Sequence, residues 1–249
     1  MNNETSMGMN RTGIGTSPLL SREMIEGARE GAVTGPDMVD PLGVVRESYS
    51  RDAMPVGTVP PPATIKGVAS TAIDALKGEK PAVLIDKLSE RLAFERAGTR
   101  LWQSVLSKFD VSGTWQGGPQ RAEIEQIVAD EAAHFELVHR AVTSLGADPT
   151  VMSPSADLAG VQSMGLVQVI SDPRTNLAQA LHAMLTAELV DNDAWVMLID
   201  LASIDHPELA TSFKTAREAE TRHLTSVRQW LVAHCRLDAR GQLDGHAAA

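Results

Sequence analysis

Apolar residues recur every three or four positions through four long stretches of the chain, which is the spacing of a helix with one buried face. A proline stands at the start of each stretch, and no stretch contains another. Proline suits the first helical turn because the N–H that it lacks has no partner there. Asp172, before Pro173, is a candidate N-cap. β-branched and aromatic runs are scarce, so we expect an all-α fold. The predicted helices cover residues 81–108, 119–145, 173–203 and 207–235.

The connections between these stretches predict how the helices are arranged. Residues 110–118 and 203–206 are short links, and short links join antiparallel neighbours. Residues 146–172 are numerous enough to cross along the bundle, and Leu158–Ile170 within them predicts a short helix. We therefore expect an antiparallel four-helix bundle over residues 81–237, with a long crossover between its second and third helices.

The first 80 residues differ in composition from the rest of the chain. They hold many of the glycines and prolines, and such a segment buries too little apolar surface to offset its ordering entropy. We expect residues 1–80 to form a flexible arm with at most two short helices, Ser21–Gly31 and Ala69–Leu76. The arm either docks on a neighbouring subunit or compartment protein, or has no binding role. Residues 238–249 are expected to be a frayed tail.

Charge and cysteine content narrow the possible partners. The formal net charge of -10 disfavours nucleic acid and anionic membrane surfaces. No apolar run approaches the roughly 20 residues that span a bilayer. The only cysteine, Cys235, excludes intramolecular disulfides and cysteine-ligated zinc or iron–sulfur sites. The first residues lack the pattern of a signal peptide, so we expect a cytoplasmic protein.

Each of the four apolar stripes has a glutamate at its centre. Two of these glutamates are followed three residues later by a histidine, which places both side chains on one helical face. A buried carboxylate is costly unless a cation or a proton accompanies it, so four of them at core positions favour a metal site. The candidate metal ligands are Glu95, Glu131, His134, Glu188, Glu220 and His223.

Depth along the helices supports the same set. The four glutamates fall 14, 12, 15 and 13 residues after the prolines of their stretches. At 1.5 Å per residue each lies roughly 18–22 Å along its helix, so all four reach one level of the bundle. A rival pair, Glu136 and His139, lies about 140° around the second helix from Glu131 and is expected to face away. The alternative is a bundle whose charges are solvated or paired with one another.

The donor types indicate which metal is expected. Carboxylate oxygens with some imidazole suit iron or manganese, whereas thiolates would favour zinc or copper. Four glutamates balance the charge of two divalent ions. We therefore expect two iron ions, with manganese as the alternative.

This Glu…Glu-x-x-His…Glu…Glu-x-x-His arrangement resembles the ferritin-like di-metal carboxylate superfamily, over residues 81–235. The resemblance implies that the six residues are metal ligands and that Glu131 and Glu220 bridge the two ions. Asp130 matches the Asp-Glu-x-x-His form of some di-iron oxygenases, where the aspartate holds a ligand histidine; a solvated charge is the other interpretation. One cysteine cannot make the four-cysteine iron site of rubrerythrins. The only tyrosine, Tyr49, lies in the arm, which disfavours the radical subunit of ribonucleotide reductase.

Three functions remain open at this point. The resemblance implies a di-iron or dimanganese oxidoreductase that reacts with O2 or peroxide, in a homo-oligomer. The same centre could instead oxidise Fe(II) for storage or detoxification. The third possibility is a metal-free helical bundle in which the arm recruits a partner.

Overall fold

A computed structural model describes residues 22–23, 26, 41–54 and 81–243, and every regular element in these ranges is a helix. The all-α prediction is therefore confirmed. The chain divides into two units, Met1–Pro55 and Val56–Ala249. In these described ranges no helix is both long and apolar enough to cross a membrane.

The first unit contains one helix that the sequence did not predict, α2 (Pro41–Asp52). Three residues of the predicted helix Ser21–Gly31 are described, and all three are helical: Arg22, Glu23 and Glu26. The predicted helix Ala69–Leu76 lies outside the described residues, as do residues 244–249 of the predicted tail.

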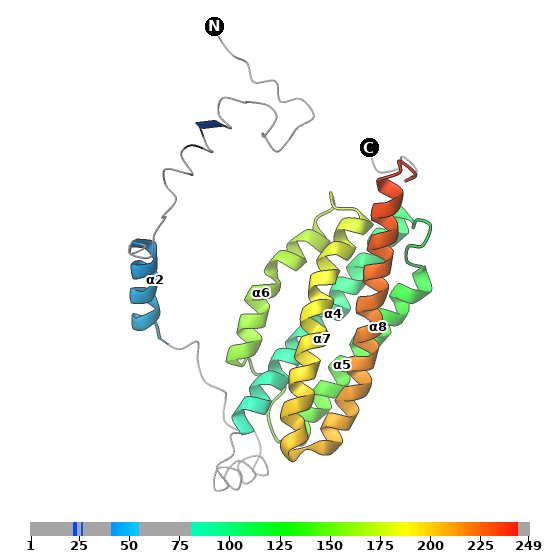
Figure 1. The fold of residues 1–249 in the computed structure, drawn as a ribbon. Coiled ribbons are helices and arrows are strands. Elements are labelled where there is room, and N and C mark those ends of the chain that lie inside the picture. Colours follow the sequence, from blue (N-terminus) through cyan, green and yellow to red (C-terminus); the bar gives the residue numbers. More distant parts are fainter. Residues whose placement is uncertain (1–21, 24–25, 27–40, 55–80, 244–249) are drawn as a thin grey trace. The chain divides into compact units, whose positions relative to one another are not determined.

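In the second unit four long helices lie side by side (Figure 1). The helices joined by short links pack on each other, α4 on α5 and α7 on α8. Between these two pairs, α4 contacts α7 and α5 contacts α8. Neighbours run antiparallel, as predicted. Their bounds are α4 (Pro81–Ser112), α5 (Arg121–Ser144), α7 (Leu177–Asp205) and α8 (Pro207–Asp238).

Two of these helices begin later than predicted. α7 starts four residues after Pro173, because Asn176 and Gln179 form a reciprocal capping box with N–H to side-chain oxygen distances of 2.9 Å. Asp172 is not its N-cap; it follows the end of α6 and accepts a hydrogen bond from the Arg174 N–H at 2.9 Å. α5 likewise begins two residues after its proline.

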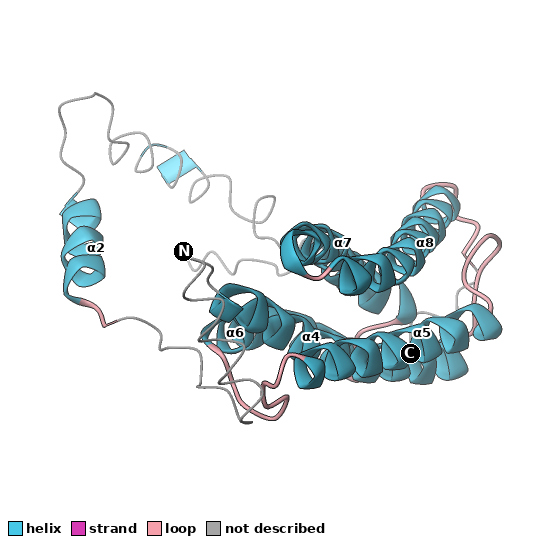
Figure 2. Ribbon diagram, turned by 90° about the horizontal axis from the view of Figure 1, so that it is seen from below, coloured by secondary structure: helices cyan, strands magenta, loops and turns pink. Residues whose placement is uncertain are grey.

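The long connection contains α6 (Pro154–Ser171), which is longer than the predicted helix. Ser153 caps it by accepting from the Ala156 N–H at 3.3 Å, and Pro154 occupies the first turn. α6 runs along the bundle against α4 and α7. Viewed along the bundle, α6, α4 and α5 form one layer and α7 and α8 the other (Figure 2).

Side chains of α4 hold this crossover near both of its ends. Asp86 accepts hydrogen bonds from Ser155 N–H at 3.0 Å and from Ser155 Oγ at 2.6 Å. Lys108 Nζ donates to the carbonyl oxygens of Asp172 at 2.8 Å and Thr175 at 2.7 Å. The position of α6 on the bundle therefore depends on polar contacts as well as on apolar packing.

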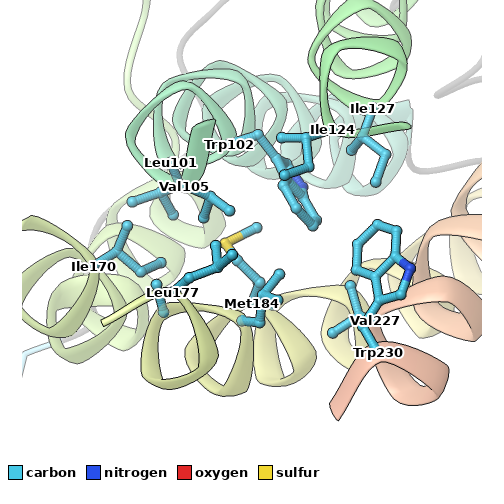
Figure 3. Close-up of a cluster of buried hydrophobic side chains, with 13 residues drawn as sticks. Leu101, Trp102, Val105, Ile124, Ile127, Ile170, Leu177, Met184, Val227 and Trp230 are labelled. Atoms are coloured by element: carbon cyan, nitrogen blue, oxygen red, sulfur yellow. The ribbon is translucent and has the colours of Figure 1, made fainter. Parts of the chain in front are cut away.

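The core is divided into two hydrophobic clusters. One is built around Trp102, Ile124, Met184 and Trp230 (Figure 3). The other is built around side chains nearer the start of α4 and those that pack on them, including Leu88, Val138, Trp195, Leu198 and Phe213. On every long helix, the predicted metal ligands lie in the sequence interval between the residues of these two clusters.

Removing the Asp86 carboxylate should weaken the attachment of α6. We expect Asp86→Ala to lower the free energy of unfolding by about 2 kcal/mol, because two hydrogen bonds to a charged acceptor are lost. Urea unfolding measures this loss. Asp200→Ala, an exposed aspartate in α7, is the matched control and should change stability by less than about 0.5 kcal/mol. Equal effects of the two substitutions would contradict the assignment.

Candidate metal centre

The six predicted ligands all point into the bundle at one level. They come from four helices: Glu95 from α4, Glu131 and His134 from α5, Glu188 from α7, and Glu220 and His223 from α8. None of the six is more than 6% exposed. The structure therefore brings together residues that span more than half of the chain.

Three groups of side chains in this level lie close enough to hold a metal ion. One comprises Glu131, Glu188, Glu220 and His223, whose ligand atoms lie within 4.8 Å of one another. Glu95, His134 and Glu220 form a second group by the same measure. The third joins Glu95, Glu131, Glu220 and Asp191. Glu220 belongs to all three groups and Glu131 to two of them, so these carboxylates connect the two halves of the cluster.

Both imidazoles face the Glu220 carboxylate. His134 Nδ1 lies 2.6 Å from Glu220 Oε1, and His223 Nδ1 lies 3.1 Å from Glu220 Oε2. The two rings are 6.2 Å apart between centroids. Glu220 thus lies between the two histidines.

Asp130 contacts the cluster from its rim. Its Oδ2 lies 3.1 Å from His223 Nε2, on the side of the ring that faces away from Glu220. Its side chain remains 24% exposed and accepts a second hydrogen bond from Gln126. A carboxylate in this position fixes the orientation and tautomer of a histidine. Asp130 thus has features of both predicted roles: it contacts His223, as a residue that orients a ligand would, and it is partly exposed, as a solvated charge would be.

Two tryptophans close the cluster on its apolar sides. Trp102 Nε1 donates to Glu188 Oε1 at 3.0 Å. The ring of Trp195 packs edge-on against His134, with 5.7 Å between the centroids. Each tryptophan also belongs to one of the two hydrophobic clusters, so the polar level is in direct contact with both.

Arg91 and Asp191 complete the cluster, and neither was predicted. Arg91 Nε lies 2.9 Å from Glu95 Oε1, and Arg91 Nη1 lies 2.5 Å from Asp191 Oδ1. Both side chains are almost fully buried. The sequence holds a signal for each, because Arg91 precedes Glu95 by one helical turn and Asp191 follows Glu188 at the Glu-x-x-His spacing.

These two residues preserve the charge balance expected of the site. The cluster contains five buried carboxylates and one guanidinium, a formal charge of −4. This charge matches two divalent cations. Arg91 therefore compensates for Asp191, and a metal pair would neutralise the four glutamates.

Burial disfavours the charged form of most of these carboxylates. It raises the pKa of Glu95 to about 8, and the nearby Asp191 adds to the shift while Arg91 opposes it. Burial also raises the pKa of Glu131 well above its usual range, with the Glu220 charge as the next contribution. The same causes raise the pKa of Glu188. Without cations, then, several of these groups hold protons near neutral pH.

Glu220 and His223 behave differently because they face each other. Burial alone would raise the pKa of Glu220, but hydrogen bonds with His134 and His223 lower it well below its usual range. Burial alone would lower the pKa of His223, but Glu220 and Asp130 raise it. The structure therefore favours an ionised Glu220 beside a charged His223.

The donor set fits a bound cation. Glu131 Oε2 and Glu188 Oε2 are buried and accept no hydrogen bond. A buried acceptor without a donor costs about 1–3 kcal/mol, and more when it is charged. A cation between these oxygens and the imidazole nitrogens would remove that cost.

Gly98 of α4 allows Glu131 to lie where it does. A Cβ on Gly98 would overlap Glu131 Oε2 and lie 3.2 Å from its Cδ. Glycine is unfavourable inside a helix by about 1 kcal/mol relative to alanine. At this position the Glu131 carboxylate occupies the space that a side chain on residue 98 would fill.

The rival pair stays outside the cluster. Glu136 is exposed and pairs with Arg140 on the same helix at 3.3 Å. His139 packs on Phe135, with 6.2 Å between ring centroids. Glu136 thus faces away from the cluster that contains Glu131, as the angle between them around the helix predicts.

No family model, curated protein or solved structure matches this chain.

Gly98→Ala should disturb the cluster. We expect it to lower the free energy of unfolding by about 1–3 kcal/mol, because the added methyl group displaces the Glu131 carboxylate from a tightly packed site. Gly160→Ala in α6, where an added Cβ meets nothing within 4 Å, is the control. It should stabilise the protein by up to about 1 kcal/mol through helix propensity alone. Denaturant unfolding of both variants measures these changes. A stabilising Gly98→Ala would contradict the close approach of Glu131 to the α4 backbone.

The metal-free protein should lose stability as the pH rises from about 5 to 8. In that window the unfolded chain has already released the Glu95 proton, whereas the folded chain keeps it until its pKa of about 8. Folding is therefore progressively disfavoured. Thermal melting of chelator-treated protein across this range measures the trend. Glu95→Gln should make the trend less steep, because Glu131 and Glu188 still contribute to it, whereas Glu136→Gln, which alters an exposed carboxyl, should leave it unchanged. A melting temperature that rises with pH would contradict the protonated cluster.

Proposed function

We propose that this chain is a ferritin-like di-metal carboxylate protein that acts as an oxidoreductase on O2 or peroxide. The observation that carries the proposal is the convergence of five carboxylates and two imidazoles, all buried, at one level of four packed helices. A bundle stabilised only by its packing has no need of them, because burying charges costs more than apolar side chains of the same volume would.

The three groups of side chains support a division of the ligands between two ions. Glu131, Glu188 and His223 would hold one ion, and Glu95 and His134 the other, with Asp191 beside them. Glu220 contributes to both, and Glu131 approaches both. Oxygen donors with one imidazole for each ion favour iron or manganese over zinc or copper.

The remaining residues control the environment of the pair. When bound, the two ions supply redox chemistry with O2 or peroxide that protein side chains lack. The hydrophobic clusters on either side exclude bulk water. Asp130 orients His223, and Arg91 pairs with Asp191 and Glu95 and opposes the effect of burial on the pKa of both carboxyls.

Oxidation of Fe(II) for storage or detoxification is the second candidate, and a groove between α5 and α8 favours it. The groove has a volume of about 300 Å³, and Glu123, Asp130 and His223 lie on its wall. Glu123 and Asp130 would attract a cation from solvent toward His223, while Arg222 on the same wall opposes this attraction. The substrate in that case is the ion itself.

Metal content tests the proposal. Protein from metal-replete cells should contain about two iron or manganese ions per chain, and Glu131→Ala combined with His134→Ala should remove at least one. The matched control is Glu136→Ala with His139→Ala, the same substitutions at the same spacing in the same helix. Metal content unchanged in the first variant, or lost equally in both, would overturn the assignment.

Kinetics separate the two candidate functions. Stopped-flow mixing of the metal-free protein with Fe(II) in oxygenated buffer should show oxidation faster than in buffer alone. If further Fe(II) beyond two per chain is also oxidised rapidly, iron oxidation is the activity. Oxidation that stops at two per chain favours an oxidoreductase with another substrate. A protein that holds no metal and does not accelerate the oxidation is a metal-free bundle.

A further inference from the structure

A cleft opens between α4, α6 and α7, on the side of the bundle away from the α5–α8 groove. Its volume is about 740 Å³, within the range of about 300–1,000 Å³ that is typical of small-molecule sites. Along α7 it extends from Gln179 to Ala194, about 22 Å at 1.5 Å per residue. Each of the three helices contributes apolar side chains to its walls, among them Phe94, Leu166, Val169, Ala183 and Val190.

The charges that reach this cleft are already paired. Glu90 forms an ion pair with Lys87 at 2.7 Å. Arg91 directs its guanidinium to Glu95 and Asp191 and packs over the Phe94 ring at 4.2 Å. Apart from His182, which also lines the cleft, no unpaired titratable side chain there could act as a counter-ion, so a charged ligand would enter a mostly apolar site at a cost. An uncharged ligand meets no such barrier.

On its inner side the cleft is adjacent to the candidate metal centre. A small inner cavity shares four wall residues with it, namely Phe94, Ser163, Leu166 and Ala187. The wall of the inner cavity also includes Glu131, Glu188 and Asp191. These four shared residues thus form a neck between the outer cleft and the carboxylates that would hold the metals.

We propose that this cleft binds an uncharged, mainly aliphatic small molecule, with one end at the neck beside Glu131 and Glu188. As a statement about the substrate class of the oxidoreductase, the inference rests on the proposed function. As a statement about binding, it does not need the metals. The apolar molecule would enter through the cleft between α6 and α7, and polar species would enter through the groove between α5 and α8.

The same surface is less suited to a docked helix. The most exposed apolar side chains of α6 are Leu158, Val161 and Met164, and none of them lines the cleft. A helix seated across them would cover the outer face of α6 and leave the neck unfilled. The position of the cleft next to the inner cavity and its carboxylates therefore favours a small ligand.

The test uses 1-octanol and octanoate as probes, which differ in the charge of one end. Saturation-transfer NMR on the metal-free full-length protein should show octanol bound and octanoate about tenfold weaker, because the carboxylate finds no free cation. Gly165→Phe introduces a ring at the cleft wall, where an added Cβ meets nothing within 4 Å. It should weaken octanol binding by about tenfold by occupying the volume that the ligand fills.

Gly160→Phe is the matched control, since Gly160 is also an exposed glycine of α6 with open space around it but does not line the cleft. It should leave octanol binding within about twofold. Val190→Trp fills the cleft from α7 and replaces the first variant if that one does not fold, with Val196→Trp as its control. Equal binding by the variant and its control, or equal binding of octanol and octanoate, overturns the inference.

A second measurement locates the bound probe. With Mn(II) added to the protein, the resonances of bound octanol should broaden, because one end lies next to the paramagnetic ion. If the protein takes up no Mn(II) while octanol still binds in the metal-free form, the proposed function fails and the cleft remains. If Mn(II) binds and octanol does not, the cleft inference fails and the metal centre remains.

Discussion

The cost of burying carboxylates governs the middle of this protein. Five of them lie at one level, where water cannot solvate them. Arg91 offsets one charge, Trp102 donates to Glu188, and the two histidines face Glu220. Even so, burial holds several of their pKa values high. An arrangement of this kind is stable at neutral pH only with protons or cations in it, and the charge of −4 matches two divalent ions.

The polar level also determines how the rest of the bundle is packed. It separates two hydrophobic clusters, and Trp102 and Trp195 belong both to those clusters and to its walls. Because α4 has a glycine at position 98, the Glu131 carboxylate can lie against the backbone of this helix. The two openings meet this level from different sides, one with Glu123, Asp130 and Arg222 on its wall and one lined mainly by apolar side chains. Selectivity for what reaches the centre would then reside in the helices that flank each opening.

Much of this could be predicted from sequence, because helical periodicity fixes which side chains share a face. The inward direction of Glu95, Glu131, Glu188 and Glu220 followed from their apolar neighbours, and the late starts of α5 and α7 did not disturb it. A shift in where a helix begins leaves the angles between its side chains unchanged. The four glutamates still lie at one level despite these shifts, because the shifts amount to about one helical turn or less.

Other features depend on contacts between helices, which periodicity does not encode. Arg91 and Asp191 each carried a spacing signal, but their pairing joins α4 to α7 across 100 positions of sequence. The cleft likewise exists only because α6 packs against α4 and α7. The capping box at Asn176 replaced the predicted cap at Asp172 because side-chain geometry at the turn, rather than the proline, decides where α7 begins.

The short links have a consequence for how the chain folds. Each link joins two helices into a hairpin, and each hairpin carries one lone glutamate and one Glu-x-x-His pair, with Asp191 as a further carboxylate in the second. Contacts within a hairpin are local in sequence and form quickly, whereas joining the hairpins requires closing the loop that contains α6. Neither hairpin alone supplies a complete set of ligands. Assembly of the cluster therefore requires that the two hairpins meet in the correct register.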